Sequence, residues 1–178
     1  MNDRSIELSL RTWYPKDHLL HFDLHHPLGK LVGEWGELLD GYMKHLYKPG
    51  YTFEPEDELV DIWYYLRILA YQLKIEFVFI PIVEVKIPKI EYLITRAIHI
   101  SSDIFIKLTS PENVNRKCPT EYYAFELSNV YSIFRFLCVQ FNLTIDQLTE
   151  ASWEKLKPGS ERGDEWMKAP DNVEIWEK

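Results

Sequence analysis

Residues 31–40, LVGEWGELLD, decide how this chain is interpreted. Two glycines, Gly33 and Gly36, lie inside what is otherwise a helical pattern, with the carboxylates Glu34 and Glu37 beside them. A glycine inside a helix costs about 1 kcal/mol relative to alanine, so two so close together need a reason. Acids three residues apart share one face of a helix. We expect the glycines to let a neighbouring helix or a ligand approach this face closely.

The pattern around this stretch predicts an all-α chain. Apolar residues recur at three- and four-residue spacing after Pro27, which is typical of an amphipathic helix. Its predicted apolar stripe comprises Leu28, Leu31, Val32, Trp35, Leu39, Tyr42 and Leu46. A short helix is predicted near residues 16–24. The first long helix runs from Pro27 to the stop signal KPG (48–50), and the second runs from Pro55 to about Lys74. A third is predicted over 89–109, a fourth over about 120–141, and a shorter fifth with Thr144 as its N-cap.

Composition limits the class of protein. The chain has 178 residues, 46% of them hydrophobic, and it carries 6 Trp, 11 Tyr and 9 Phe, which indicates one folded domain over residues 1–178. A net charge of −8 argues against a binder of nucleic-acid polymers, which would need a basic surface. The two cysteines, Cys118 and Cys138, form no metal or redox spacing, and no apolar run suggests a membrane span. We therefore expect a cytoplasmic location.

Two segments of the chain are similar in sequence, which we call the internal repeat. ELVDIWYYLRILAYQLKI from Glu58 aligns without a gap with ELSNVYSIFRFLCVQFNL from Glu126. Identical or related residues coincide at Glu58 and Glu126, Trp63 and Tyr131, Arg67 and Arg135, and Gln72 and Gln140. This suggests a duplicated helical hairpin, with a first copy over about 25–75 and a second over about 89–141, before a helix and tail over 144–178. In the second copy Asn129 replaces Asp61, and HISSDIF stands where the first has GEWGELL. Two buried helices sharing a pattern by chance remain the alternative.

Four acids form two pairs with the same spacing. Glu34 and Glu37 lie opposite the leucine stripe, so taken alone they fit a solvated face with salt bridges. Asp61 lies where an apolar helix begins, and burying an unpaired carboxylate is costly. Two helices joined by a short loop tend to pack antiparallel, which can bring this pair, with Glu58, opposite the first. Four converging carboxylates would suit Mg²⁺, whereas a di-iron bundle would need a Glu-x-x-His motif that the chain lacks.

The same residues carry a family resemblance. LVGEWGEL followed by EDELVDIWYYLRILAYQLKI resembles the MazG-like, all-α nucleoside triphosphate pyrophosphohydrolases, which include the dimeric dUTPases and dCTP pyrophosphatases. Their motif, Glu-Glu-x-x-Glu and then Glu-x-x-Asp, is matched except that Gly33 replaces the first acid. ASWEKLKPGSER is similar to the family's C-terminal stretch, with Ser152 in place of Asn and Lys155 matching its lysine. The resemblance is strong over residues 25–75, moderate near 151–162 and weak between.

The resemblance implies a function and roles for individual residues. The family splits a nucleoside triphosphate into a monophosphate and pyrophosphate, with Mg²⁺ as cofactor and Mn²⁺ as a possible substitute. The implied metal ligands are Glu34, Glu37, Glu58 and Asp61, with Glu37 also the catalytic base, and the implied substrate-binding residues are Lys44, Tyr65, Lys155 and Arg162. Lys44 could instead simply pair with Glu37. In the family the four-helix core forms between subunits, so we expect either a homo-oligomer or a duplicated chain that builds a comparable bundle alone.

Two other functions remain open. The chain could be a degenerate relative that binds nucleotide or metal without catalysis, given Gly33 and the altered second half. It could also be a structural helical protein whose acids form salt bridges only. The residues that would select the base lie outside the matched motifs, so the sequence leaves the identity of the nucleotide undetermined.

Overall fold

A computed structural model describes residues 24–82, 89–109, 120–157 and 160. These residues form five helices and no strand, which confirms the all-α prediction for the described part of the chain. The helices are α2 (His25–Tyr47), α3 (Glu56–Leu73), α4 (Ile90–Thr109), α6 (Thr120–Gln140) and α7 (Ile145–Leu156). The short helix predicted near 16–24 lies almost entirely outside the described residues, as does the tail beyond residue 160.

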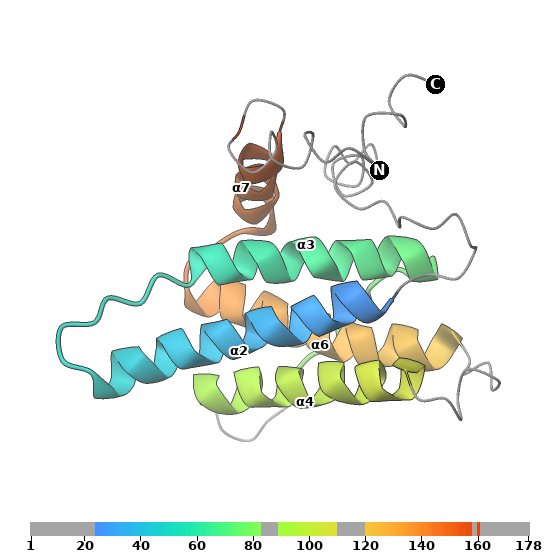
Figure 1. Cartoon of the computed structure of the whole chain (residues 1–178), viewed down its shortest axis with the longest axis horizontal. Helices are drawn as coiled ribbons and strands as arrows, with labels where there is room; N and C mark the ends of the chain where they lie inside the picture. The colour runs from blue at the N-terminus through green and yellow to red at the C-terminus, as the bar shows by residue number, and fades with distance from the viewer. Residues whose placement is uncertain (1–23, 83–88, 110–119, 158–159, 161–178) are drawn as a thin grey trace.

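Four of the helices lie side by side as a bundle (Figure 1). The helix α2 packs against both α3 and α4, and α6 packs against α4 and less extensively against α3. Chain direction alternates between α2 and α3 and between α4 and α6, so each pair forms an antiparallel hairpin (Figure 1). The fifth helix, α7, packs against α3 at the end of the bundle where α3 begins (Figure 1).

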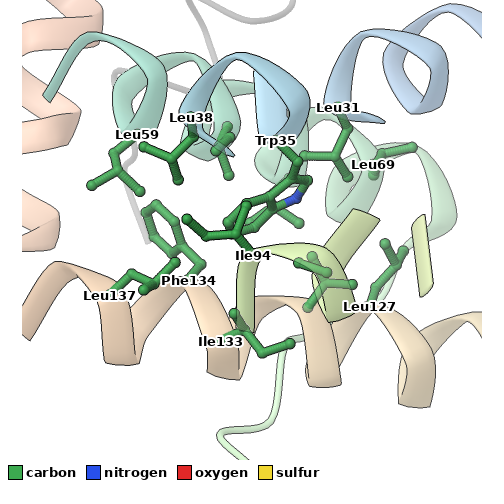
Figure 2. Packing of buried hydrophobic residues seen from close by; sticks show 14 of the residues in the cluster. Leu31, Trp35, Leu38, Leu59, Leu69, Ile94, Leu127, Ile133, Phe134 and Leu137 are labelled. Carbon is green, nitrogen blue, oxygen red and sulfur yellow. The ribbon is translucent and has the colours of Figure 1, made fainter. Parts of the chain in front are cut away.

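The core is built around Trp35, which is fully buried in the middle of α2. Leu59 of α3, Ile94 of α4 and Phe134 of α6 are likewise fully buried and converge on the same interior (Figure 2). Burying a side chain of this kind stabilises the fold by about 1.5–3 kcal/mol relative to leaving it exposed. The four bundle helices therefore share a single apolar core.

The predicted apolar stripe of α2 is partly wrong. Leu38, which the stripe omits, is fully buried, whereas Leu39 is only partly buried. Leu46, which the stripe includes, is 46% exposed because α2 extends beyond its partners at this end. The helix also begins at His25, two residues before the predicted start at Pro27. Pro27 is still in the first turn, where a backbone N–H has no helical partner to lose.

The start of α7 is fixed locally, as predicted. The Thr144 side chain accepts a hydrogen bond from the Gln147 backbone N–H (3.2 Å), and the Gln147 side chain accepts one from the Thr144 N–H (2.8 Å). This reciprocal capping box satisfies two backbone donors that a helix start would otherwise leave without partners. Just before it, Asn142 adopts a positive φ of 57°, which turns the chain out of α6.

The described part of the α3–α4 connection, up to residue 82, is extended and forms no strand. It follows α6: the backbone N–H of Val78 donates to Ser128 Oγ (3.1 Å), and that of Ile80 donates to Ser132 Oγ (2.8 Å). Two serines one turn apart on α6 therefore hold the connection against the second hairpin.

The packing has the arrangement that an internal duplication requires. The pairs α2–α3 and α4–α6 each form a hairpin, and the first helices of the two hairpins, α2 and α4, pack against each other. Trp63 and Tyr131, which occupy equivalent positions in the internal repeat, contact each other with ring centroids 6.1 Å apart. Equivalent residues meet in this way beside a pseudo-twofold axis. The duplication itself stays a prediction.

Candidate metal and phosphate site

The two acidic pairs face each other across α2 and α3. Asp61 is the nearby charge with the largest effect on the pKa of Glu34, and Glu37 acts on the pKa of Glu58. Moving from Glu34 to Glu37 along α2 therefore corresponds to moving from Asp61 back to Glu58 along α3, as expected for antiparallel helices. The sequence spacing and the helix packing together bring Glu37, Glu58 and Asp61 within electrostatic reach of Glu34.

Glu34 is the acid most affected by this arrangement. Burial first, and then repulsion from Asp61 and Glu37, raise the pKa of Glu34 to about 7, and Lys30 only partly opposes them. Glu34 is half-buried, so a fully solvated face, which the sequence favoured for the first pair taken alone, is wrong for this residue. Glu37, the other member of the pair, is exposed to solvent.

Glu58 lies partly inside the contact between the helices. Its Oε2 atom is buried and makes no hydrogen bond to any described residue. Burial, followed by repulsion from Asp57 and Glu37, raises the pKa of Glu58, while a backbone hydrogen bond and Lys155 act in the opposite direction. A buried carboxylate oxygen without a partner is costly, so this atom is suited to receive a cation.

Lys155 brings α7 to the same acids. Its Nζ atom lies 3.1 Å from Asp57 Oδ1 and 3.4 Å from Asp61 Oδ1, and it also lies 3.4 Å from the Asp57 carbonyl oxygen. A second contact attaches α7 to α3 nearer the start of α7, where the indole N–H of Trp63 donates to Thr149 Oγ1 (2.9 Å). The motif-matching lysine is therefore positioned by α7, beside the acids of α3.

Asp57 is a member of this group that the sequence analysis missed. It precedes Asp61 by one helical turn and shares Lys155 with it. Acids in the first turn of a helix are favourable to its dipole whatever else they do, so Asp57 does not stand out within EPEDE (54–58). The i, i+4 spacing of Asp57 and Asp61 was the signal that could have revealed it.

The other predicted substrate-binding residues are less closely connected to the acids. Lys44 pairs with Asp40 (2.5 Å), not with Glu37, and lies two turns beyond Glu37 on α2. Tyr65 is half-buried one turn after Asp61, edge-on to Tyr64 with ring centroids 5.1 Å apart. Arg162 lies outside the described residues.

The close approach of a helix does not explain the two glycines of residues 31–40. A Cβ atom added at Gly33 or Gly36 would meet no described atom within 4 Å, so the expectation that a neighbouring helix requires them is wrong. As far as the described residues go, the positions of these two glycines beside Glu34 and Glu37 are open. A packing reason exists at Gly41, where a Cβ would lie 3.1 Å from the ring of Phe53.

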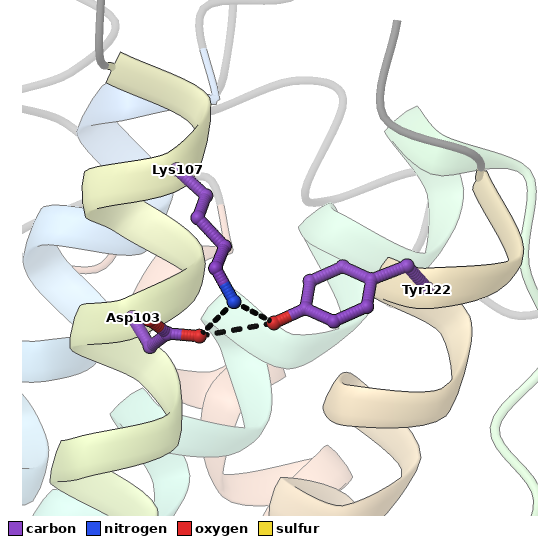
Figure 3. A network of polar contacts seen from close by, with 3 residues as sticks. All are labelled: Asp103, Lys107 and Tyr122. Atoms are coloured by element: carbon purple, nitrogen blue, oxygen red, sulfur yellow. Dashed lines mark hydrogen bonds and ion pairs between the residues drawn. The ribbon is translucent and has the colours of Figure 1, made fainter. Parts of the chain in front are cut away.

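The second hairpin has no equivalent group of acids among its described residues. Its single acid in the stretch HISSDIF, Asp103, accepts hydrogen bonds from Lys107 (2.6 Å) and Tyr122 (2.9 Å), which also contact each other (Figure 3). The hydrogen bond from Lys107 is the main cause that lowers the pKa of Asp103. The charge of this carboxylate is therefore balanced by its own neighbours. Among the described residues, the group of facing acids belongs to the first hairpin.

The acids fit a divalent cation in their chemistry but do not form a closed cage. Within the described segments, no three Asp, Glu, His or Cys side chains are arranged so that they could hold a metal ion together. Mg²⁺ commonly takes only one or two carboxylates and completes its shell with water and substrate phosphates. The unpartnered Glu58 oxygen and the mutual repulsion at Glu34 are the features that a divalent cation would relieve.

The chain matches no protein-family model, no curated protein and no solved structure. Among the described helices, none combines the length and apolar character needed to cross a membrane. The fold and the site therefore define this protein as a helical bundle with two acid-bearing helices in contact and a lysine from a peripheral helix beside them.

Proposed function

We propose that this protein is a Mg²⁺-dependent nucleoside triphosphate pyrophosphohydrolase of the MazG-like kind. One observation carries the proposal: across the antiparallel helices α2 and α3, Asp61 acts electrostatically on Glu34 and Glu37 acts on Glu58, and Lys155 lies beside Asp61. Mn²⁺ is expected to substitute for Mg²⁺. A cytoplasmic location would place the enzyme with its nucleotide substrates.

The acids would hold the cation, and each has a distinct environment. Glu34, Glu58 and Asp61 are partly buried, so they would retain the ion through the reaction. Bound Mg²⁺ would neutralise charge developing on the phosphate oxygens. Lys155, already at the border of the acid group, would bind a phosphate oxygen through its ammonium group.

Glu37 is the proposed general base. It is exposed to solvent, so a water molecule can reach it, and it belongs to the acid group through Glu58. The water oxygen forms a bond to the α-phosphorus while the bond from that phosphorus to the α–β bridging oxygen breaks. The proton passes to Glu37, and pyrophosphate leaves with the bridging oxygen. No described atom lies within 4 Å of a Cβ built at Gly33 or Gly36, which supports approach of the triphosphate to this face.

The test is pyrophosphate release from a panel of canonical and modified dNTPs with Mg²⁺. Glu37→Gln and Asp61→Asn are expected to lower kcat by at least a hundredfold, in the range that loss of a general base or ligand produces. Asp40→Asn is the matched control, because Asp40 lies on the same helix but pairs with Lys44 away from the group. Asp103→Asn is a second control in the other hairpin.

The assay also separates the alternatives. Metal-dependent nucleotide binding without turnover would identify a degenerate relative. Neither binding nor turnover would identify a structural protein whose acids form salt bridges only. If Asp61→Asn raised thermal stability and left activity intact, the assignment of Asp61 as a metal ligand would be wrong.

A further inference from the structure

A hollow of about 400 Å³ lies directly beside the acid group. It is open to solvent on one side and is bordered by the loop between α2 and α3, the start of α3, the link between α6 and α7, and α7 itself. Its lining residues are Phe53, Glu54, Pro55, Glu56, Asp57, Val60, Phe141, Leu143 and Ala151. This volume is in the range of small-molecule sites, which is roughly 300–1,000 Å³.

Two aromatic rings form one wall of the hollow. Phe53 and Phe141 lie edge to face, with centroids 5.5 Å apart and planes at 72°. The ring of Tyr42 on α2 packs edge to face against Phe53 with centroids 5.6 Å apart, and Gly41 leaves the space that the Phe53 ring occupies. Since a Cβ at position 41 would displace Phe53, the backbone of α2 is adapted to this ring. The wall is therefore a positioned aromatic surface, of the kind on which a planar ring packs.

Charge gives the hollow an orientation. Glu54, Glu56 and Asp57 line it. The side of the hollow that these acids form disfavours phosphate groups and favours an uncharged ring that carries hydrogen-bond donors. The cation Lys155 lies at its border and contacts both Asp57, which lines the hollow, and Asp61, which belongs to the acid group. An elongated ligand with one anionic end would accordingly lie with that end toward Lys155.

We propose that this hollow binds the nucleobase of the substrate, and that it favours bases with an exocyclic amino group. This inference rests on the proposed function, because the triphosphate is what directs the nucleotide to the acids and Lys155. Cytosine, adenine and guanine can donate from an amino group to the acidic rim, whereas uracil and thymine offer only a ring N–H. Phe53 and Phe141 are the proposed base-packing residues, and the rim acids Glu54, Glu56 and Asp57 are the proposed specificity-determining residues.

The test compares base-dependent and base-independent binding in the full chain. Phe141→Ala is expected to raise KM for dCTP and dATP at least tenfold, consistent with the loss of one base–aromatic contact. The inhibition constant of inorganic tripolyphosphate, which has no base, should stay within twofold. Phe125→Ala is the matched control, because Phe125 is an exposed phenylalanine on α6 that does not line the hollow. Equal weakening of nucleotide and tripolyphosphate binding, or no effect on either, would overturn the proposal.

Two further variants keep the test decisive. Phe141→Leu retains apolar volume for folding, and it should weaken nucleotide binding while the thermal midpoint stays close to that of the wild type. Glu56→Gln should reduce the preference for dCTP over dTTP by severalfold, because it removes a rim carboxylate and leaves the aromatic wall in place. An unchanged preference would contradict the role of the acidic rim.

A phosphate-free ligand distinguishes failure of this inference from failure of the proposed function. Saturation-transfer NMR with deoxycytidine and deoxythymidine reports on the hollow even if no nucleotide is hydrolysed. Binding of deoxycytidine that is lost in Phe141→Ala and kept in Phe125→Ala supports a nucleobase site. No binding of either nucleoside to the wild-type protein would reject it, whatever the outcome of the pyrophosphate assay.

Discussion

Lys155 of α7 lies 3.4 Å from the carboxylate of Asp61 on α3, although the two residues are 94 positions apart in the chain. The pair is partly buried, with side-chain exposures of 24% and 27%. It places a fixed positive charge next to the acids that are proposed to hold Mg²⁺. A divalent cation bound there as proposed would compete with this lysine for Asp61.

Lys155→Met should separate these effects. Removal of the ammonium group takes away a cation that pairs with Asp61 and Asp57, so Mg²⁺ affinity in the absence of nucleotide should rise. KM for the nucleotide should rise as well, because a proposed phosphate ligand is lost. The free energy of unfolding should fall by at most about 1 kcal/mol, since the pair is partly exposed. Isothermal titration with Mg²⁺ and steady-state kinetics measure the two effects. Lys157→Met, whose lysine pairs with Glu154, is the control, and unchanged affinity for Mg²⁺ would contradict the competition.

Stability should fall as pH rises through the range set by Glu34. Its folded pKa is about 7, above the unfolded value of about 4.5, so the folded state holds a proton that the unfolded state has lost. Between these values the free energy of unfolding should decrease, by on the order of 1–2 kcal/mol after allowance for solvent screening. Urea unfolding as a function of pH measures this slope, which Glu34→Gln should remove and Asp40→Asn should retain.

Mg²⁺ should oppose the same pH dependence. The ion binds the ionised carboxylate, so it should stabilise the protein more above pH about 7 than below pH about 5. Thermal unfolding with and without Mg²⁺ at the two pH values provides the measurement. Equal stabilisation at both values would indicate that the ion binds away from Glu34.

The glycines of α2 should respond to alanine in opposite ways. Gly33→Ala and Gly36→Ala should each stabilise the protein by about 1 kcal/mol, because alanine favours the helix and its methyl group meets no described atom. If substrate approaches this face, the same variants should lose activity. Gly41→Ala should destabilise the protein, because its Cβ would lie 3.1 Å from Phe53. Chemical denaturation and the pyrophosphate assay provide the comparison, and a destabilised Gly36→Ala would refute the open-space interpretation.

The core should be most sensitive at Trp35. Trp35→Ala should lower the free energy of unfolding by about 3–5 kcal/mol, because the side chain is fully buried where all four bundle helices meet. Trp35→Phe should cost less, since its indole N–H makes no hydrogen bond to a described residue and only volume is lost. Urea denaturation measures both. A loss as large for phenylalanine as for alanine would reveal a partner of the indole N–H.

The helices were predictable from the sequence because each is specified by local signals. The 3.6-residue periodicity and the residues Thr144 and Pro55 act within one or two turns, and the structure places helix boundaries within two residues of the prediction. The facing of Glu34 and Asp61 was predictable too, because a short loop imposes antiparallel packing on α2 and α3. Their role as metal ligands stays a prediction.

The rest of the site depends on contacts between segments far apart in the chain. Asp57 shares Lys155 only because α7 folds back on α3, and no pattern within either helix encodes that contact. The aromatic hollow needs Phe53 from one loop and Phe141 from another to meet. Gly41 looks like an ordinary helix glycine until the Phe53 ring is placed against it.

The segment before α7 sets the position of Lys155. Asn142 and the capping box at Thr144 set the direction in which the helix leaves α6, and Lys155 lies near the far end of the helix, about 15 Å along its axis. A rotation of about 10° at this segment would move the lysine by roughly 2.5 Å at that radius. That displacement is comparable to the 3.4 Å separating Lys155 Nζ from Asp61 Oδ1, so the packing of α7 on α3, with the Trp63–Thr149 hydrogen bond, is what keeps the charge at the acids.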